Sequence, residues 1–353
     1  MRVLRWLAVA ISGLLIFSVV VAQDTACPAL VEQALQASDK ACSDLGRNQI
    51  CYGNIKAEAL DRAGDPLTFA AAGDRIAVQD VSKLVTFPMN VKDKTWGVAL
   101  LSLQANLPDT LPGQNVSLVA FGDVSLDNEV KADTPPAPSL SAVATGKINI
   151  RAGAGTSFDL AGTVQKGDSV TAIGRNEKGD WIQVLFDKGT GWVFASLLRI
   201  TGDAKTLLPT KGDVAYNAPM QAFTFHDNTS GLKCAEAPEN GLLIQSPQHV
   251  NVSFRINGID IKVGSTALIR SASNNTVRIL NLEGNVVASP DTSGVQLLPG
   301  QLIEASAGNA PGNVQVYTAD DVRALPLSLL PDAITLAPVI TDIQTHTVIA
   351  NGT

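Results

Sequence analysis

The clearest alternation of hydrophobic and polar side chains lies in residues 145–200. Apolar and polar residues alternate over residues 148–151 and again over residues 181–184, which is typical of strands with one buried face. Turns that contain glycine, such as residues 166–168, separate these runs. Five short strands in fewer than 60 residues predict a small closed barrel, for which we set the bounds 142–202.

A helical pattern comes before the barrel, in residues 23–60. Apolar residues recur at intervals of three and four after Pro28, which suits the first turn of a helix. Residues 45–48 interrupt this pattern, and the apolar residues from Ile50 to Ala59 predict a second, shorter helix. The sequence therefore predicts a short N-terminal α-helical hairpin.

The four cysteines are expected to form two disulfides. Cys42 and Cys51 lie at equal distances from the centre of the predicted hairpin, so they are expected to face each other and to close it. Elimination then pairs Cys27 with Cys234. A zinc site is the competing interpretation, but the cysteine spacings match no zinc motif.

Two further segments have strand-like patterns, residues 61–130 and residues 214–318. Short apolar runs are separated in both by turn signals, such as Asn257-Gly258 in the second. Residues 131–141 contain three prolines and few apolar residues, which is typical of a semi-rigid linker. The expected architecture is mainly β and multidomain, with the barrel between two β-rich domains and with residues 319–353 as a C-terminal tail.

The barrel segment resembles a bacterial SH3-type (SH3b) domain. That family combines a strand ending in Asn-x-Arg, a glycine-rich loop, a Gly-Asp turn, a Trp-x-x-Val strand and a Gly-Trp-Val strand. Ala154 departs from the pattern, because the family usually has proline there, and the loop is expected to be less rigid. The resemblance implies a binding module without naming its ligand. The matching residues are Asn149, Arg151, Gly153, Gly155, Thr156, Gly167, Asp168, Trp181, Val184, Gly191, Trp192 and Val193.

Residues 214–318 resemble the exported domain of FecR-type proteins. The resemblance rests on a hairpin, a Gly-Ser-Thr strand from Gly264, a Leu-Glu-Gly-Asn-Val strand from Leu282 and a Leu-Pro-Gly-Gln turn from Leu298. It implies a β-helix-like or sandwich scaffold that is used for protein contacts and has no catalytic residues.

Residues 1–22 resemble a secretory signal peptide, with Arg2 and Arg5 before a long apolar run. An uncleaved membrane anchor is the alternative. A lipid-modified Cys27 is disfavoured, because Asp24 stands where such signals prefer an apolar residue. The protein is therefore expected to be exported, to the extracellular space or the cell envelope. Removal of the segment changes the formal net charge from −7 to −9, which disfavours nucleic acid as a partner.

Residues suited to catalysis are sparse. His226, His249 and His346 lie in three different segments, and none has a neighbour spaced for a metal site or a triad. Adjacent residues in a strand point to opposite faces, so His226 and Asp227 do not form a base and its orienting partner. The glycine-rich stretch from Gly153 lacks the Lys-Ser/Thr of a phosphate loop. We therefore expect no enzyme, no metal and no cofactor.

Binding by the barrel is the leading functional hypothesis. Residues 145–200 contain seven basic and five acidic side chains, a mildly basic balance within an acidic chain. Aromatic faces and arginine donors suit sugars and short peptides, so we select Asn149, Arg151, Phe158 and Trp181 as candidate ligand-binding residues. The alternative is that the tryptophans only pack in the core, Trp192 fully and Trp181 beneath a loop.

The resemblance implies cell-wall peptidoglycan, or a peptide of it, as the ligand. There are two alternatives to a wall-binding function. One is an extracytoplasmic scaffold or sensor protein that contacts other envelope proteins. The other is a cell-wall hydrolase, which the sequence disfavours.

Overall fold

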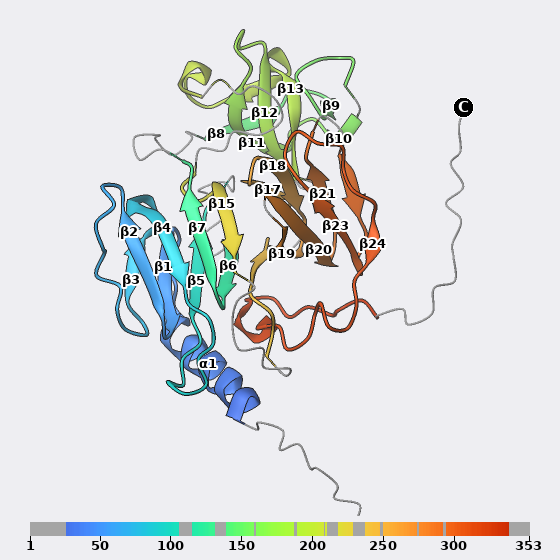
Figure 1. The fold of residues 1–353 in the computed structure, drawn as a ribbon. Coiled ribbons are helices and arrows are strands. Elements are labelled where there is room, and N and C mark those ends of the chain that lie inside the picture. Colours follow the sequence, from blue (N-terminus) through green and yellow to red (C-terminus); the bar gives the residue numbers. More distant parts are fainter. Residues whose placement is uncertain are drawn as a thin grey trace, which may run out of the picture.

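The computed structural model describes residues 26–105, 115–130, 139–158, 160–186, 189–207, 209, 218–228, 237–247, 250–273, 275–291 and 294–338. These residues form three β-sheets and one α-helix, so the expected mainly β architecture is confirmed (Figure 1). No helix in this part of the chain is both long and apolar enough to cross a membrane. The predicted signal segment, residues 1–22, lies outside the described residues.

Two of the sheets form a single domain, which we call the two-sheet domain. Sheet A has nine strands, in the spatial order β24 (Gln315–Val316), β23 (Gln301–Ala305), β20 (Thr276–Glu283), β19 (Thr266–Ser273), β16 (Gly241–Gln245), β6 (Val116–Phe121), β5 (Val98–Leu103), β1 (Gln49–Asn54) and β3 (Arg75–Ala77). Sheet B has eight, in the order β2 (Ala57–Asp61), β4 (Val81–Thr86), β7 (Val124–Asn128), β15 (Ala222–Asp227), β17 (Val252–Ile256), β18 (Ile259–Val263), β21 (Val286–Ser289) and β22 (Val295–Leu297).

The prediction of two separate β-rich domains, residues 61–130 and 214–318, is wrong. Strands from both segments join within each sheet, because β6 pairs with β16 in sheet A and β7 pairs with β15 in sheet B. The chain places successive hairpins alternately in the two sheets: β17–β18 in B, β19–β20 in A and β21–β22 in B. Neither segment holds a complete sheet, so neither is a domain by itself.

The main core lies between the two sheets. Apolar side chains from alternate positions of both sheets meet there, including Phe223 and Phe254, whose ring centroids are 6.4 Å apart. The opposite face of sheet B carries charged pairs, Lys83 with Asp127 and Arg255 with Asp260, all partly exposed. Sheet B is therefore apolar on one face and polar on the other, as expected when one face meets solvent.

The outer face of sheet A is covered by protein. Helix α1 (Ala26–Cys42) packs on it with Leu30, Val31 and Ala34 buried, as the spacing predicted. Residues 317–336 pass over the same face and contribute Tyr317, Leu325 and Leu329 to a second core. We call these residues the C-terminal strap. The residues of the predicted tail beyond 338 lie outside the described part of the chain.

The predicted second helix is wrong, because residues 49–54 form strand β1. Ile50 and Tyr52 belong to the core between the sheets, whereas Cys51 belongs to the core beneath α1. Successive side chains therefore point to opposite faces and both faces are buried, as expected for a central strand. The run of apolar residues there was too short for its spacing to distinguish a helix from a strand.

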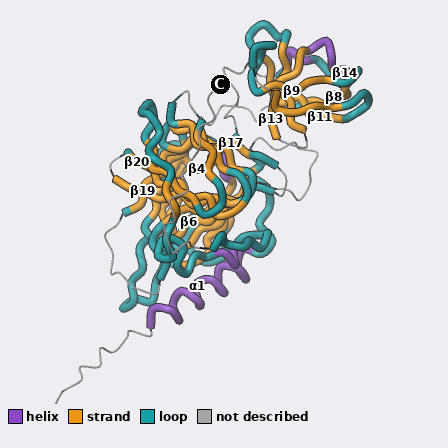
Figure 2. Tube along the Cα trace, turned by 90° about the vertical axis from the view of Figure 1, so that its right-hand side faces the viewer, coloured by secondary structure: helices purple, strands orange, loops and turns teal. Residues whose placement is uncertain are grey.

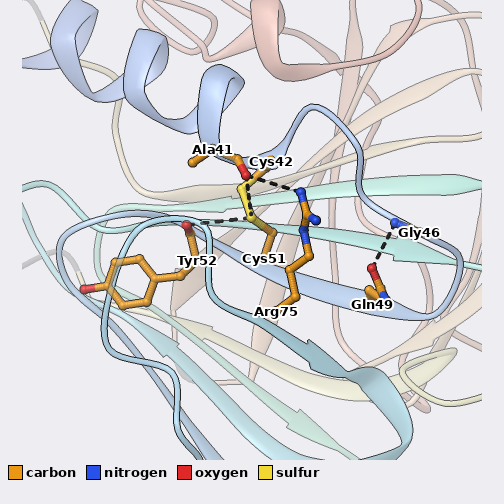
Figure 3. The surroundings of a disulfide bond; sticks show 7 residues. All are labelled: Ala41, Cys42, Gly46, Gln49, Cys51, Tyr52 and Arg75. Carbon is orange, nitrogen blue, oxygen red and sulfur yellow. Dashed lines mark hydrogen bonds between the residues drawn. A yellow bond between two sulfur atoms is a disulfide. The ribbon is translucent and has the colours of Figure 1, made fainter.

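The predicted Cys42–Cys51 disulfide is confirmed, although it closes a helix onto a strand (Figure 3). It ties the last residue of α1 to β1, and the Arg75 side chain donates to the Ala41 carbonyl beside it. Cys27 is also disulfide-bonded. Its predicted partner, Cys234, lies outside the described residues.

Replacing both Cys42 and Cys51 with alanine is expected to lower the free energy of unfolding by about 2–3 kcal/mol, because the bond closes a loop of about ten residues. Urea unfolding of the oxidised protein measures the change. A loss below about 0.5 kcal/mol would show that α1 is held by its apolar contacts alone. Reduction of the wild type is not an equivalent test, since it also opens the bond of Cys27.

The third sheet is the predicted barrel. Its seven strands run in the order β10 (Leu160–Val164), β9 (Ile148–Arg151), β13 (Gly189–Phe194), β12 (Trp181–Phe186), β11 (Ser169–Arg175), β8 (Leu140–Ala144) and β14 (Leu198–Ile200). It has a core of its own, which includes Ile150, Val184 and Val193. Figure 2 shows it as a separate lobe.

The sequence predicted five strands and the barrel has seven. Strands β8 and β14 pair with each other at the two ends of the barrel segment, and β8 takes Leu140 and Ser141 from the predicted linker 131–141. Residues 131–138 of that linker lie outside the described residues. The barrel is inserted between β7 and β15, which are hydrogen-bonded neighbours in sheet B.

Candidate ligand-binding face of the barrel

Strand alternation divides the barrel residues between a core face and an outer face. Ile148 and Ile150 of β9 point into the barrel core, so Asn149 and Arg151 lie on the outer face. Asn149 is exposed and Arg151 is half-buried. Both predicted polar residues are therefore placed where a ligand could reach them.

A row of three side chains crosses the outer face from β9 to β12. Arg151 lies directly opposite Trp192 of β13, and Trp192 lies directly opposite Gln183 of β12. Directly opposed residues of antiparallel strands lie on the same face of the sheet. The row joins an arginine, an indole and an amide on one face of the sheet, where Trp192 and Gln183 are buried.

Trp192 is buried, as the packing interpretation expected, with 1% of its surface exposed. Its side chain lies on the outer face of the sheet, whereas the neighbouring Val193 points into the barrel core. Its indole N–H is buried without a hydrogen-bond partner among the described residues. Trp192 is therefore the floor of this face and not part of the main barrel core.

The loop that follows β9 is closed by Arg151 and Phe158. The guanidinium of Arg151 donates from Nη1 to the Phe158 carbonyl oxygen at 2.8 Å. The Phe158 ring lies against Gly153, where a Cβ atom would stand only 2.5 Å from the ring. Phe158 nevertheless remains 49% exposed. Gly153 is required here because any side chain would displace the ring.

A second aromatic contact lies on β12 and β13. Trp181 and Phe194 are directly opposite each other, with ring centroids 5.7 Å apart in an edge-to-face arrangement. Asn176 fixes the start of β12, since its side-chain oxygen accepts from the Trp181 amide and its amino group donates to Asp180. Trp181 is half-buried, whereas Phe194 is 42% exposed.

The four predicted site residues fall into two groups on this face. Arg151 and Phe158 are in contact, with Asn149 two positions earlier on the same strand. Trp181 contacts Phe194 instead, and the buried Trp192 lies directly opposite Arg151 and two positions before Phe194. The face thus has an arginine and a phenylalanine at one side and an aromatic pair at the other.

Phe194 was missed by the sequence prediction, together with Leu160 and Leu197. All three are large apolar residues that the barrel leaves exposed. The signal for Phe194 was present, because it lies two positions after Trp192 and so shares its face. The other two lie beside turns, where the alternation gives no orientation.

Metal-binding and titratable groups are not concentrated here. Within the described ranges, no three His, Cys, Asp or Glu side chains are grouped as a metal site requires. His226 is exposed on β15 of the two-sheet domain, while the neighbouring Asp227 accepts a hydrogen bond from the Ser271 amide. His249 and His346 lie outside the described residues.

Comparison with known proteins places the barrel in a family. Residues 146–199 match the bacterial SH3 domain, so this part of the sequence prediction is confirmed. The match begins after β8 and ends within β14. No curated protein matches the chain. The resemblance of residues 214–318 to FecR-type proteins stays a prediction.

Proposed function

We propose that the protein is a non-catalytic binding protein of the cell envelope, and that its bacterial SH3 domain binds peptidoglycan or a peptide of the cell wall. One observation carries the proposal. In a domain of this family, the outer face exposes Phe158 and Phe194 on either side of a floor formed by Trp192. Exposed aromatic side chains that share one face of a domain are typical of an interaction surface.

The chemistry of the face suits a short peptide or glycan segment. The aromatic faces offer stacking surfaces, and the guanidinium of Arg151 still has donors beyond the one that it gives to Phe158. Asn149 adds an exposed amide at the same side. The two aromatic groups are separated along the strands, so an extended ligand would contact both.

Sedimentation of the full chain with purified sacculi tests the proposal. Trp181→Ala and Phe194→Ala are each expected to reduce the bound fraction at least about tenfold, as for hot-spot aromatic residues. Leu298→Ala is the matched control, because it removes an exposed apolar side chain from the two-sheet domain. Equal sedimentation of all four proteins would contradict the proposal.

A scaffold function through protein contacts is the second candidate. The observation that favours it is the open edge of sheet A at β24, where Val314 and Val316 are both exposed. Exposed edge strands can accept a strand from a partner. The FecR-type resemblance of residues 214–318 would be consistent with such a contact. Recovery of a defined envelope protein by the wild type, and its loss on Val316→Lys, would favour this candidate.

A further inference from the structure

A groove of 740 Å³ lies on the outer face of sheet A. One wall is the end of α1 and the loop after it, and the other wall is residues 328–332 of the C-terminal strap. The floor is formed by β5, β6 and β16. Its volume is within the range of small-molecule sites.

The floor of the groove is unusually polar for a covered sheet face. Elsewhere on this face α1 and the strap pack on large apolar residues such as Leu243 and Leu268. In the groove, Ser102 lies directly opposite Ser117, and Ser117 lies directly opposite Gln245. Small hydroxyl side chains therefore replace apolar ones along the floor of the groove.

The hydroxyl of Ser102 is the first evidence for a ligand in the groove. Ser102 is only 5% exposed, and it lines the groove. Neither its hydroxyl nor that of the half-buried Ser117 makes a hydrogen bond with any residue in the described ranges, and neither oxygen is fully enclosed by protein, so both are accessible from the groove. A ligand with hydrogen-bonding groups would satisfy them, and a purely apolar ligand would not.

The strap wall is fixed by Gln245. Its side-chain nitrogen donates to the Asp332 carbonyl oxygen at 2.8 Å, and its side-chain oxygen accepts from the Asp332 amide at 2.9 Å. These bonds use the backbone of Asp332, which lines the groove, and do not engage its carboxylate. The wall is therefore built before any ligand arrives.

The charged residues that line the groove are both acidic. Asp39 lies on the helix side and Asp332 on the strap side, and no Lys, Arg or His is among the described residues that line it. Leu100, Val119 and Leu329 also line the groove. A ligand that is complementary to this lining has a positive charge, hydrogen-bond donors and an aliphatic part.

We propose that the groove binds a primary ammonium group carried on a short aliphatic chain. The ammonium donates to Asp332 or Asp39 and to the serine hydroxyls, while the methylene groups lie on the leucine and valine side chains. Two sources have this chemistry, a free alkyl diamine and a lysine side chain of a peptide. The site is independent of the barrel and of the function proposed for it.

Isothermal titration of the full chain tests this proposal with three probes. They are 1,5-diaminopentane, Nα-acetyl-lysine amide and the neutral 1,5-pentanediol. We expect at least one amine to bind at least about tenfold more tightly than the diol. Tighter binding of the diamine would indicate a free diamine as the ligand, and tighter binding of the lysine amide would indicate a peptide.

Two variants locate the binding. Asp332→Asn keeps the backbone bonds to Gln245 and removes one charge, and Ser117→Leu fills the groove; each is expected to weaken amine binding at least about tenfold. Asp44→Asn is the matched control, since this exposed residue of the loop after α1 does not line the groove. Binding no tighter for the amines than for the diol, or equal weakening by Asp44→Asn, would overturn the proposal. Thermal unfolding of each variant confirms that it is folded.

Discussion

Replacing Arg270 with methionine is expected to lower the free energy of unfolding by about 3 kcal/mol or more. Arg270 is only 3% exposed, on β19 beneath the C-terminal strap. Its guanidinium donates to the carbonyl oxygens of Asn240 at 3.1 Å and Asp321 at 2.7 Å. Burial lowers the pKa of Arg270, while the nearby carboxylates of Glu239, Asp321 and Asp227 oppose that shift.

The loss is large because the partners of Arg270 remain when it is removed. Replacing a whole buried ion pair with apolar residues can be neutral, since no polar group is then left behind. Methionine fills a similar volume but leaves the partly buried carbonyl groups of Asn240 and Asp321 without the donor that they have in the wild type. It also releases the segment around Asp321, which holds the strap against sheet A.

Arg278 provides the matched control. It lies directly opposite Arg270 on β20 and also faces the strap, but its side chain is about one-third exposed. Its main partner is the Glu304 carboxylate, at 2.6 Å, which water can solvate when the arginine is lost. Arg278→Met is therefore expected to cost about 1 kcal/mol or less. Equal losses in the two variants, measured by urea unfolding at pH 7, would show that burial does not decide the effect.

The sequence identified strands in the two-sheet domain but not the partners of those strands. Residues 98–103 and 116–121 are apolar on both faces apart from Ser102 and Ser117, because the main core lies on one side and α1 with the strap on the other. Such continuous runs show burial without showing which strand lies beside them. The pairing of β6 with β16 joins residues more than one hundred positions apart, with the whole barrel between them. Local patterns contain no record of that contact.

The barrel was easier to predict because its signals are local. Its strands alternate regularly, and glycines mark the turns between them, as at Gly167 and Gly179, which both have positive φ. The candidate site was only partly predictable for the same reason. A motif located Arg151 and Trp181, but the contact of Trp181 with Phe194 depends on the register of β12 against β13.

Removing the barrel is expected to abolish binding to sacculi completely and to leave the two-sheet domain folded. The barrel leaves the domain after β7 and returns before β15, where the Glu129 amide donates to the Ala222 carbonyl oxygen at 3.0 Å. The two ends of the insertion are therefore held close together by sheet B itself. A linker of about six glycine and serine residues in place of residues 131–217 is long enough for a hairpin connection.

The residues on either side of this deletion belong to the two-sheet domain and must be kept. Val130 is buried and its carbonyl oxygen accepts from Arg62 at 2.7 Å. Met220 is fully buried in the core between the sheets, and its amide donates to the Asn128 side chain. A deletion that extends into either end would remove core contacts and confuse the loss of the barrel with unfolding.

The separation of the cores decides the outcome of this experiment. The described residues of the barrel pack around their own core, and no barrel residue belongs to either core of the two-sheet domain. Stability held in separate cores is nearly additive, so the shortened protein should lose one unfolding transition and keep the other within about 1 kcal/mol. Far-UV circular dichroism and urea unfolding measure this, and amine binding in the groove should be unchanged.

If the shortened protein is folded and still sediments with sacculi, the wall-binding surface lies on the two-sheet domain. If it fails to fold, the barrel is a structural part of sheet B despite its separate core.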